Sequence, residues 1–122
     1  MANMVTHTSY AKNQKQILIG QDSFHIALPI KLSGEANATI KAGEVLSGDV
    51  ATRLSTEFTV GTSSAAGLLL HEVVLDSKGK GNGTIVVAGC IDKLKLDSGV
   101  LANIETAKES LKNIIITEGS AI

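Results

Sequence analysis

Apolar and polar residues alternate over several short stretches of this chain. In the first of them, every second position is apolar: Ile26, Leu28, Ile30 and Leu32. A period of two is typical of a β-strand that buries one face. Because Pro29 has no backbone N–H to donate, we expect this strand to lie at a sheet edge.

A second alternation runs from residue 53 to 60, with Phe58 near its middle, and predicts a half-buried strand. Residues 68–75 are apolar at odd and even positions alike, apart from His71 and Glu72, which predicts a central strand. Shorter strands are expected at residues 45–46, 84–88 and 114–117.

Glycines and small polar residues mark the connections. Lys41–Glu44 is typical of a tight turn in which Gly43 is free to adopt a positive φ. Gly61–Gly67 is expected to be a loop of small residues. Asp76–Gly83, with the sequence DSKGKGNG, predicts a long hairpin loop whose mobile tip carries Lys78.

One helix is expected late in the chain. Asp97 and Ser98 can cap a helix that begins near Gly99 and ends near Asn113. The apolar residues that share one face of it, at spacings of three and four, are Val100, Ile104, Ala107 and Leu111.

The pattern predicts an α+β, mainly β fold of six to eight short strands and one short C-terminal helix, arranged as a small β-barrel or sandwich. Residues 1–16 are polar and without a period, so we expect a flexible N-terminal arm. A chain of 122 residues fits one domain, which we place at residues 17–122.

The amino-acid composition argues against some classes of binding partner. The chain has 11 basic and 12 acidic residues, a net charge of -1, and only 2% aromatic residues. It therefore lacks both the positive charge and the stacking faces with which proteins bind nucleic acids. No apolar run approaches the ~20 residues of a membrane span, and the first ten residues do not resemble a signal peptide. Apolar residues make up 43% of this small chain, so we expect a protein interface rather than a nucleic-acid or membrane partner.

Few residues are spaced for chemistry. His71 and Glu72 are neighbours in an expected strand, so their side chains should point to opposite faces. His7 and His25 have no metal-ligand spacing, and Cys90 stands alone, which excludes an intrachain disulfide. The glycines near residue 80 do not match a phosphate-binding loop. We expect no enzyme activity, no catalytic residues, no cofactor and no metal.

One alternative concerns Lys78. A lysine at a hairpin tip is the attachment site in lipoyl and biotinyl carrier domains, and AGEVLSGD (residues 42–49) is similar to their Gly-x-x-Val turns. Here Gly79, Lys80 and Gly81 follow the lysine, although a carrier site needs a rigid support. A swinging-arm carrier domain therefore stays the second hypothesis.

Four segments in order carry a family resemblance: AGEVL, AAGLLLHEVVLD, TIVVAGCIDKLKL and ETAKESLKNIIIT, within about residues 40–118. Together they resemble the head decoration proteins of tailed bacteriophages, the family of the lambda head decoration protein. The polar arm is similar to that family's arms in character but not in sequence. The segment Leu96–Gly99 also lacks the aromatic or proline residue that the family often carries before its helix.

The resemblance implies a β-tulip-like fold and a structural role without catalysis. Such proteins bind the expanded phage head as homotrimers at local threefold positions, contact the major capsid protein, and stabilise the shell against internal DNA pressure. The resemblance places the protein on the outer surface of the virion, after synthesis in the host bacterial cytoplasm. It also implies that the arm contacts the capsid, through residues that include Val5, Thr6, His7, Thr8 and Tyr10.

Overall fold

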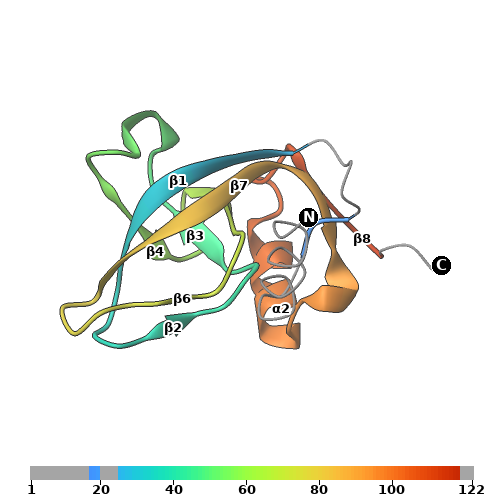
Figure 1. Cartoon of the computed structure of the whole chain (residues 1–122). Coiled ribbons are helices and arrows are strands. Elements are labelled where there is room, and N and C mark those ends of the chain that lie inside the picture. Colours follow the sequence, from blue (N-terminus) through green and yellow to red (C-terminus); the bar gives the residue numbers. More distant parts are fainter. Residues whose placement is uncertain (1–16, 20–24, 119–122) are drawn as a thin grey trace, which may run out of the picture.

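Five strands close into a small β-barrel in this computed structural model, which describes residues 17–19 and 25–118 (Figure 1). Around the barrel the order is β1, β4, β3, β5 and β7, and β7 pairs back onto β1. These strands are β1 (Ile26–Ser33), β3 (Val45–Ser47), β4 (Glu57–Val60), β5 (Ala65–Leu69) and β7 (Lys80–Asp92). The prediction of a mainly β, α+β barrel with one short helix is confirmed.

The remaining elements extend this barrel. Strand β8 adds to β7 in parallel, and β2 pairs with β6 in a separate two-stranded sheet. Their bounds, with those of the helices, are β2 (Thr39–Ile40), η1 (Val50–Thr52), β6 (Val73–Val74), η2 (Lys93–Lys95), α2 (Ser98–Ala107) and β8 (Ile114–Thr117). Among the described residues, no helix is long and apolar enough to cross a membrane.

Strand β1 is one of the five strands of the closed barrel and pairs with β4 on one side and β7 on the other. The prediction that it forms a sheet edge was therefore wrong. Pro29 is tolerated there because its carbonyl oxygen points away from β7 and accepts a hydrogen bond from Arg53 Nη1 at 2.9 Å. The backbone nitrogen of a strand residue points to the same side as its carbonyl oxygen. Pairing with β4 on that side involves Lys31 and Leu32 only, so no ladder donor is missing at Pro29.

Strand β7 begins earlier than the sequence indicated. Lys80 to Gly83 was expected to belong to a loop, but these residues pair with β1. Both glycines of this stretch are in contact with apolar side chains: a Cβ on Gly83 would lie 2.9 Å from Leu32 Cδ1, and one on Gly81 would lie 3.0 Å from Leu75 Cδ2. Glycine therefore permits close packing in a strand here, rather than marking a loop.

Residues 53–56 form turns, so the strand predicted from residue 53 was wrong for its first half. The carbonyl oxygen of Thr52 accepts hydrogen bonds from the N–H and the hydroxyl of Thr56, at 2.9 and 3.0 Å. Local bonds of this kind compete with a strand ladder. Strand β4 begins only at Glu57, and Leu54 is 65% exposed.

Residues 68–75 form two strands instead of the one expected. Strand β5 starts at Ala65, inside the stretch expected to be a loop, and ends at Leu69. A bend then leads to β6, which pairs with β2. The expectation of a central strand holds for β5, which lies between β3 and β7.

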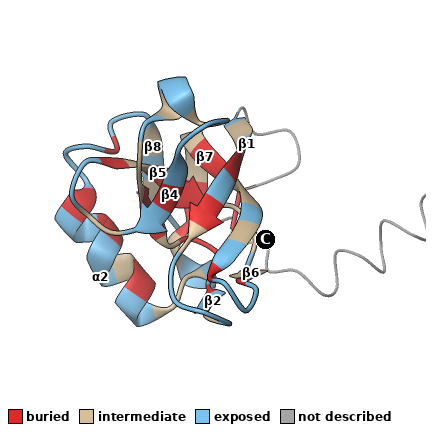
Figure 2. Cartoon of the chain, turned by 90° about the vertical axis from the view of Figure 1, so that its left-hand side faces the viewer, coloured by how far each residue is buried: buried red, intermediate tan, exposed pale blue. Residues whose placement is uncertain are grey.

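Alternate residues of the central strands enter two apolar clusters, and the burial of both faces explains the apolar residues at every position of β5. All five barrel strands contribute to the first, which we call the inner core: Ile30, Leu32, Ile40, Leu46, Phe58, Leu69, Leu75 and Ile85. The second, the outer core, lies between the sheet and α2: Ile17, Leu18, Ala42, Val45, Ala65, Leu68, Val86, Ile91, Val100, Ile104, Ala107 and Leu111. Figure 2 shows the buried residues gathered along the barrel strands and along one side of α2.

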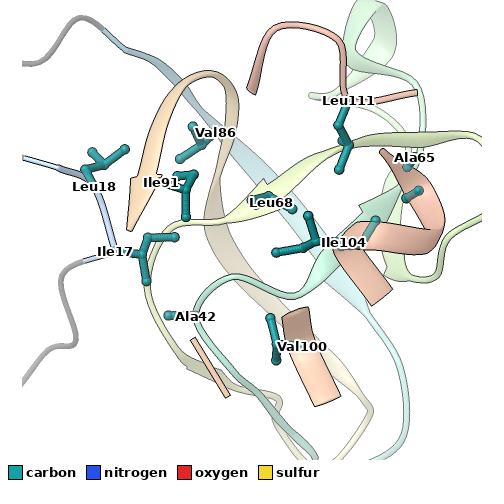
Figure 3. Close-up of a cluster of buried hydrophobic side chains, with 12 residues drawn as sticks. Ile17, Leu18, Ala42, Ala65, Leu68, Val86, Ile91, Val100, Ile104 and Leu111 are labelled. Atoms are coloured by element: carbon teal, nitrogen blue, oxygen red, sulfur yellow. The ribbon is translucent and has the colours of Figure 1, made fainter. Parts of the chain in front are cut away.

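The outer core joins both ends of the described chain to the barrel. In Figure 3, Val100 and Ile104 project from α2, and Ile17 and Leu18 lie beside Ile91. The helical face predicted from spacing is confirmed for Val100, Ile104 and Ala107, which are buried; Leu111 is buried too but lies beyond the helix. Helix α2 ends at Ala107 rather than near Asn113, and turns follow it.

Strand β1 shows one departure from its apolar pattern. The pairing with β7 shifts between Ile26 and Ala27, which face Ala88 and Val86, and beyond this shift Ile26 is 42% exposed. The extra residue of this bulge is Val87, which belongs to β7 rather than to β1.

Candidate functional site

The turn that carries Lys78 is short and held by hydrogen bonds. It runs from Asp76 to Gly79, where an eight-residue loop was expected. Asp76 Oδ1 accepts from the backbone N–H of Lys78 at 2.8 Å and of Lys80 at 2.9 Å. The bond from Lys80, followed by that from Lys78, lowers the pKa of the Asp76 carboxyl. Lys78 is therefore exposed on a fixed turn.

Gly79 completes this turn. Its φ is +77°, and a Cβ there would collide with the carbonyl oxygen of Gly34. Both the conformation and the close approach require glycine. Gly43 also has a positive φ, +92°, in the turn before β3, which confirms the conformation predicted for it.

The histidines and the cysteine do not form a reactive cluster. His71 and Glu72 lie in the bend between β5 and β6, so the prediction that they occupy a strand was wrong. Burial lowers the pKa of His71, and its buried Nδ1 has no hydrogen-bond partner among the described residues. Cys90 is half-buried in β7, opposite Ile115. Within residues 17–19 and 25–118, no group of three or more His, Cys, Asp or Glu side chains is placed to hold a metal ion.

A groove opens where the ends of β1 and β4 meet β2. Its volume is about 420 Å³. Apolar side chains and two carboxylates line it, together with hydroxyl groups. The lining residues that matter below are Glu35, Ala38, Ile40, Glu44, Val60 and Leu75.

Glu44 is the more enclosed of the two carboxylates in the groove. Desolvation raises its pKa, and Lys41 offsets this only in part. Lys41 itself forms an ion pair with Asp97, with Nζ and Oδ2 2.9 Å apart. Asp97 is the N-cap residue of α2, as predicted, but no cap hydrogen bond from its side chain is seen. The groove therefore has negative charge and no basic residue in its lining.

Several large apolar side chains remain outside both cores. Their exposed fractions run from 42% to 67%. They are Ile26, Leu54, Val60, Val74, Leu94 and Ile115. Leu94 is the most exposed of them and lies in η2 between Lys93 and Lys95.

Neither the six exposed apolar side chains nor the groove at β2 was identified from the sequence. The groove combines residues that are far apart in the chain, from Ser33 to Leu75. The exposure of Leu94 had one local signal in the sequence, the two lysines on either side of it. The predicted capsid-binding residues Val5, Thr6, His7, Thr8 and Tyr10 lie outside the described residues.

Comparisons of the chain with protein-family models, with curated proteins and with solved structures find no match.

Proposed function

We propose that the protein is a structural decoration protein of a bacteriophage head. It binds the outer surface of the expanded shell as homotrimers at local threefold positions and stabilises the shell against internal DNA pressure. The partner is the major capsid protein, and the role requires neither catalysis nor a cofactor. The virion is then its working location.

The family resemblance supports this proposal because its segments coincide with framework positions of the barrel. The first includes Gly43, in its positive-φ turn. Ala66–Leu69 lies in β5, Val86–Gly89 in β7 and Ile114–Ile116 in β8. The resemblance therefore rests on residues that form strands and a turn of the fold, and it carries the function by analogy with the family.

The observation that carries the proposal is the apolar surface. Two clusters already fill the barrel and the space beneath α2, yet six large apolar side chains remain at least 42% exposed. Apolar side chains that lie together in one patch mark a contact site, so the proposal requires that neighbouring subunits cover several of these six together. A structural protein that works by covering neighbouring subunits needs such a surface.

Co-sedimentation with purified expanded shells tests the proposal. We expect saturable binding near one copy per coat subunit, and shells that have not expanded are the matched control. Deletion of residues 1–16 should leave folding intact, since the described residues of both cores, from Ile17 to Leu111, all remain, and should weaken binding to the shell. Absence of saturable binding, or binding unchanged by the deletion, would contradict the proposal or its assignment of the arm.

The second candidate is a swinging-arm carrier domain. One observation favours it: the two bonds to Asp76 fix the turn that exposes Lys78, which supplies the rigidity that such a site requires. Intact mass after co-expression with lipoyl and biotinyl ligases tests this function, with Lys78→Arg as the control. A mass increment lost in Lys78→Arg would support it, and an unchanged mass would contradict it.

A further inference from the structure

The turn η2 presents an apolar side chain between two cations. Leu94 is 67% exposed, Lys95 is exposed, and Lys93 is half-buried. Asp92 Oδ1 accepts a hydrogen bond from the N–H of Leu94 at 3.0 Å, which holds the turn from one side. On the other side, Leu96 packs over Gly43. The backbone of Lys93–Lys95, which we call the knob, is thus anchored. The side chains of Leu94 and Lys95 are exposed, and Lys93 Nζ lies 3.9 Å from Glu118 Oε2.

The groove at β2 has the opposite character. Ala38, Ile40 and Leu75 give it apolar walls, and the carboxylates of Glu35 and Glu44 supply negative charge. Desolvation already disfavours the charged form of Glu44, as its raised pKa shows. A cation brought close to this carboxylate would compensate for the water that it has lost.

We propose that the knob of one copy of this chain docks into the groove of a second copy. Leu94 enters between the apolar walls, and the two lysines lie against the two glutamates. Lys93 exchanges its exposed partner Glu118 for a glutamate of the groove. Apolar burial at the centre with complementary charge at the rim is the usual arrangement of a protein interface. Both halves of the contact are present on the described chain, which favours a second copy as the occupant.

The positions of the knob and the groove on the molecule determine how two copies meet in this contact. Asp92, at the end of β7, leads directly into the knob, whereas Lys80, at its start, pairs with Ser33 at the groove. Strand β7 has 13 residues, a contour of about 40 Å at about 3.3 Å per residue. Figure 1 shows β7 arching from the hairpin beside β2 and β6 across the barrel to the side of α2.

Two different patches that meet in this way form a heterologous, head-to-tail contact. Such contacts generate a closed ring when the rotation between copies closes, and a trimer is the smallest ring beyond a dimer. In its biological setting this inference rests on the proposed function, because it supplies the contact that a homotrimer on the shell requires. Its test uses the free protein and does not depend on shells.

Disulfide trapping tests the pairing in a Cys90→Ala background. Leu94→Cys and Val60→Cys proteins are mixed at about 1 mM, where even a weak contact is populated. We expect a crosslinked heterodimer. Leu54→Cys is the control partner, because Leu54 is 65% exposed but lies outside the groove. Crosslinking no stronger than with Leu54→Cys would overturn the proposal, as would equal crosslinking of Leu94→Cys with itself.

Sedimentation equilibrium of charge variants provides the second readout. Glu35→Lys or Lys95→Glu alone should weaken self-association about tenfold. The double variant should restore it, because every contact in the ring then regains opposite charges. Glu109→Lys, at an exposed residue outside the groove, is the charge-matched control and should change little. No restoration in the double variant would overturn the pairing.

The two proposals fail in different ways. If Leu94→Asp abolishes self-association and shell binding persists at the same stoichiometry, the interface stands and the shell does not require it. If the wild type stays monomeric at about 1 mM while Glu35→Lys loses shell binding, the groove binds the coat protein, and the inference of a second copy is overturned. If trapping succeeds and no shell is bound, the decoration function is the proposal that fails.

Discussion

The inner and the outer core share strands β3, β5 and β7 but hold different parts of the molecule together. Neighbouring residues of one strand separate into the two, as with Leu68 in the outer and Leu69 in the inner core. The inner core is built from barrel strands and from the β2 and hairpin segments that cover its end. The outer core adds residues from α2 and from Ile17 and Leu18.

This difference has a consequence for stability. Barrel strands exchange backbone hydrogen bonds all around the closed sheet, so removal of inner-core volume weakens every strand. Helix α2 touches the sheet through side chains, and its own hydrogen bonds are internal. The outer core should therefore open locally before the barrel unfolds. The following substitutions test this comparison, from the largest expected effect to the smallest.

Phe58→Ala removes the largest side chain of the inner core. Phe58 is fully buried, and a Cβ on Gly48 would lie 2.5 Å from its ring, so its surroundings are closely packed. We expect a loss of about 4 kcal/mol in the free energy of unfolding. Urea denaturation followed by circular dichroism measures it. A loss below about 1 kcal/mol would show that the barrel interior tolerates a cavity.

Ile104→Ala makes the corresponding cavity in the outer core. Ile104 is 1% exposed on the buried face of α2. We expect a loss of about 3 kcal/mol. Hydrogen exchange should accelerate first in α2 and β8, with the amides of β1 and β4 still protected. Equal acceleration throughout the barrel would contradict the separation of the two cores.

Gly67→Ala tests a close backbone approach between β5 and β7. Gly67 lies in β5, and a Cβ there would collide with the carbonyl oxygen of Val86 and lie 2.8 Å from Ile85 Cγ1. We expect a loss of about 2 kcal/mol. Gly99→Ala is the matched control, because nothing lies within 4 Å of its Cβ in the first turn of α2. That change should stabilise the protein by up to about 1 kcal/mol. Thermal unfolding of both variants gives the comparison.

Asp76→Ala should have the smallest effect, because the Asp76 carboxylate is exposed and supports a single turn. The turn loses the bonds to Lys78 and Lys80, so a small decrease in melting temperature is expected. The pKa of Asp76 is lowered in the folded protein, so its contribution is present above the ordinary value of 3.8 and is lost as the pH falls through the lowered pKa. A difference between wild type and variant that stays constant from neutral pH to pH ~2 would contradict this role.

Local periodicity was informative where one face of an element is buried. The helical spacing of Val100, Ile104 and Ala107 predicted the face that α2 buries, and the alternation of Ile30 and Leu32 predicted the inward face of β1. Periodicity wrongly predicted a strand at Leu54 and Thr56, because apolar and polar residues also alternate in this turn, which has its own hydrogen bonds. Sequence indicated the turn glycine at Gly43, but it mistook Gly81 and Gly83 for loop residues.

The sequence by itself determined the strand-rich composition, the late helix with its buried face and the conformation at Gly43, because each depends on residues within a few positions of one another. Tertiary structure decided the closure of the barrel, since the pairing of β1 with β7 joins residues far apart in the sequence, from Ser33 with Lys80 to Ile26 with Ala88. It also decided which glycines pack against side chains and which carboxylates share the groove. Those features depend on distances between strands, and such distances exist only once the chain has folded.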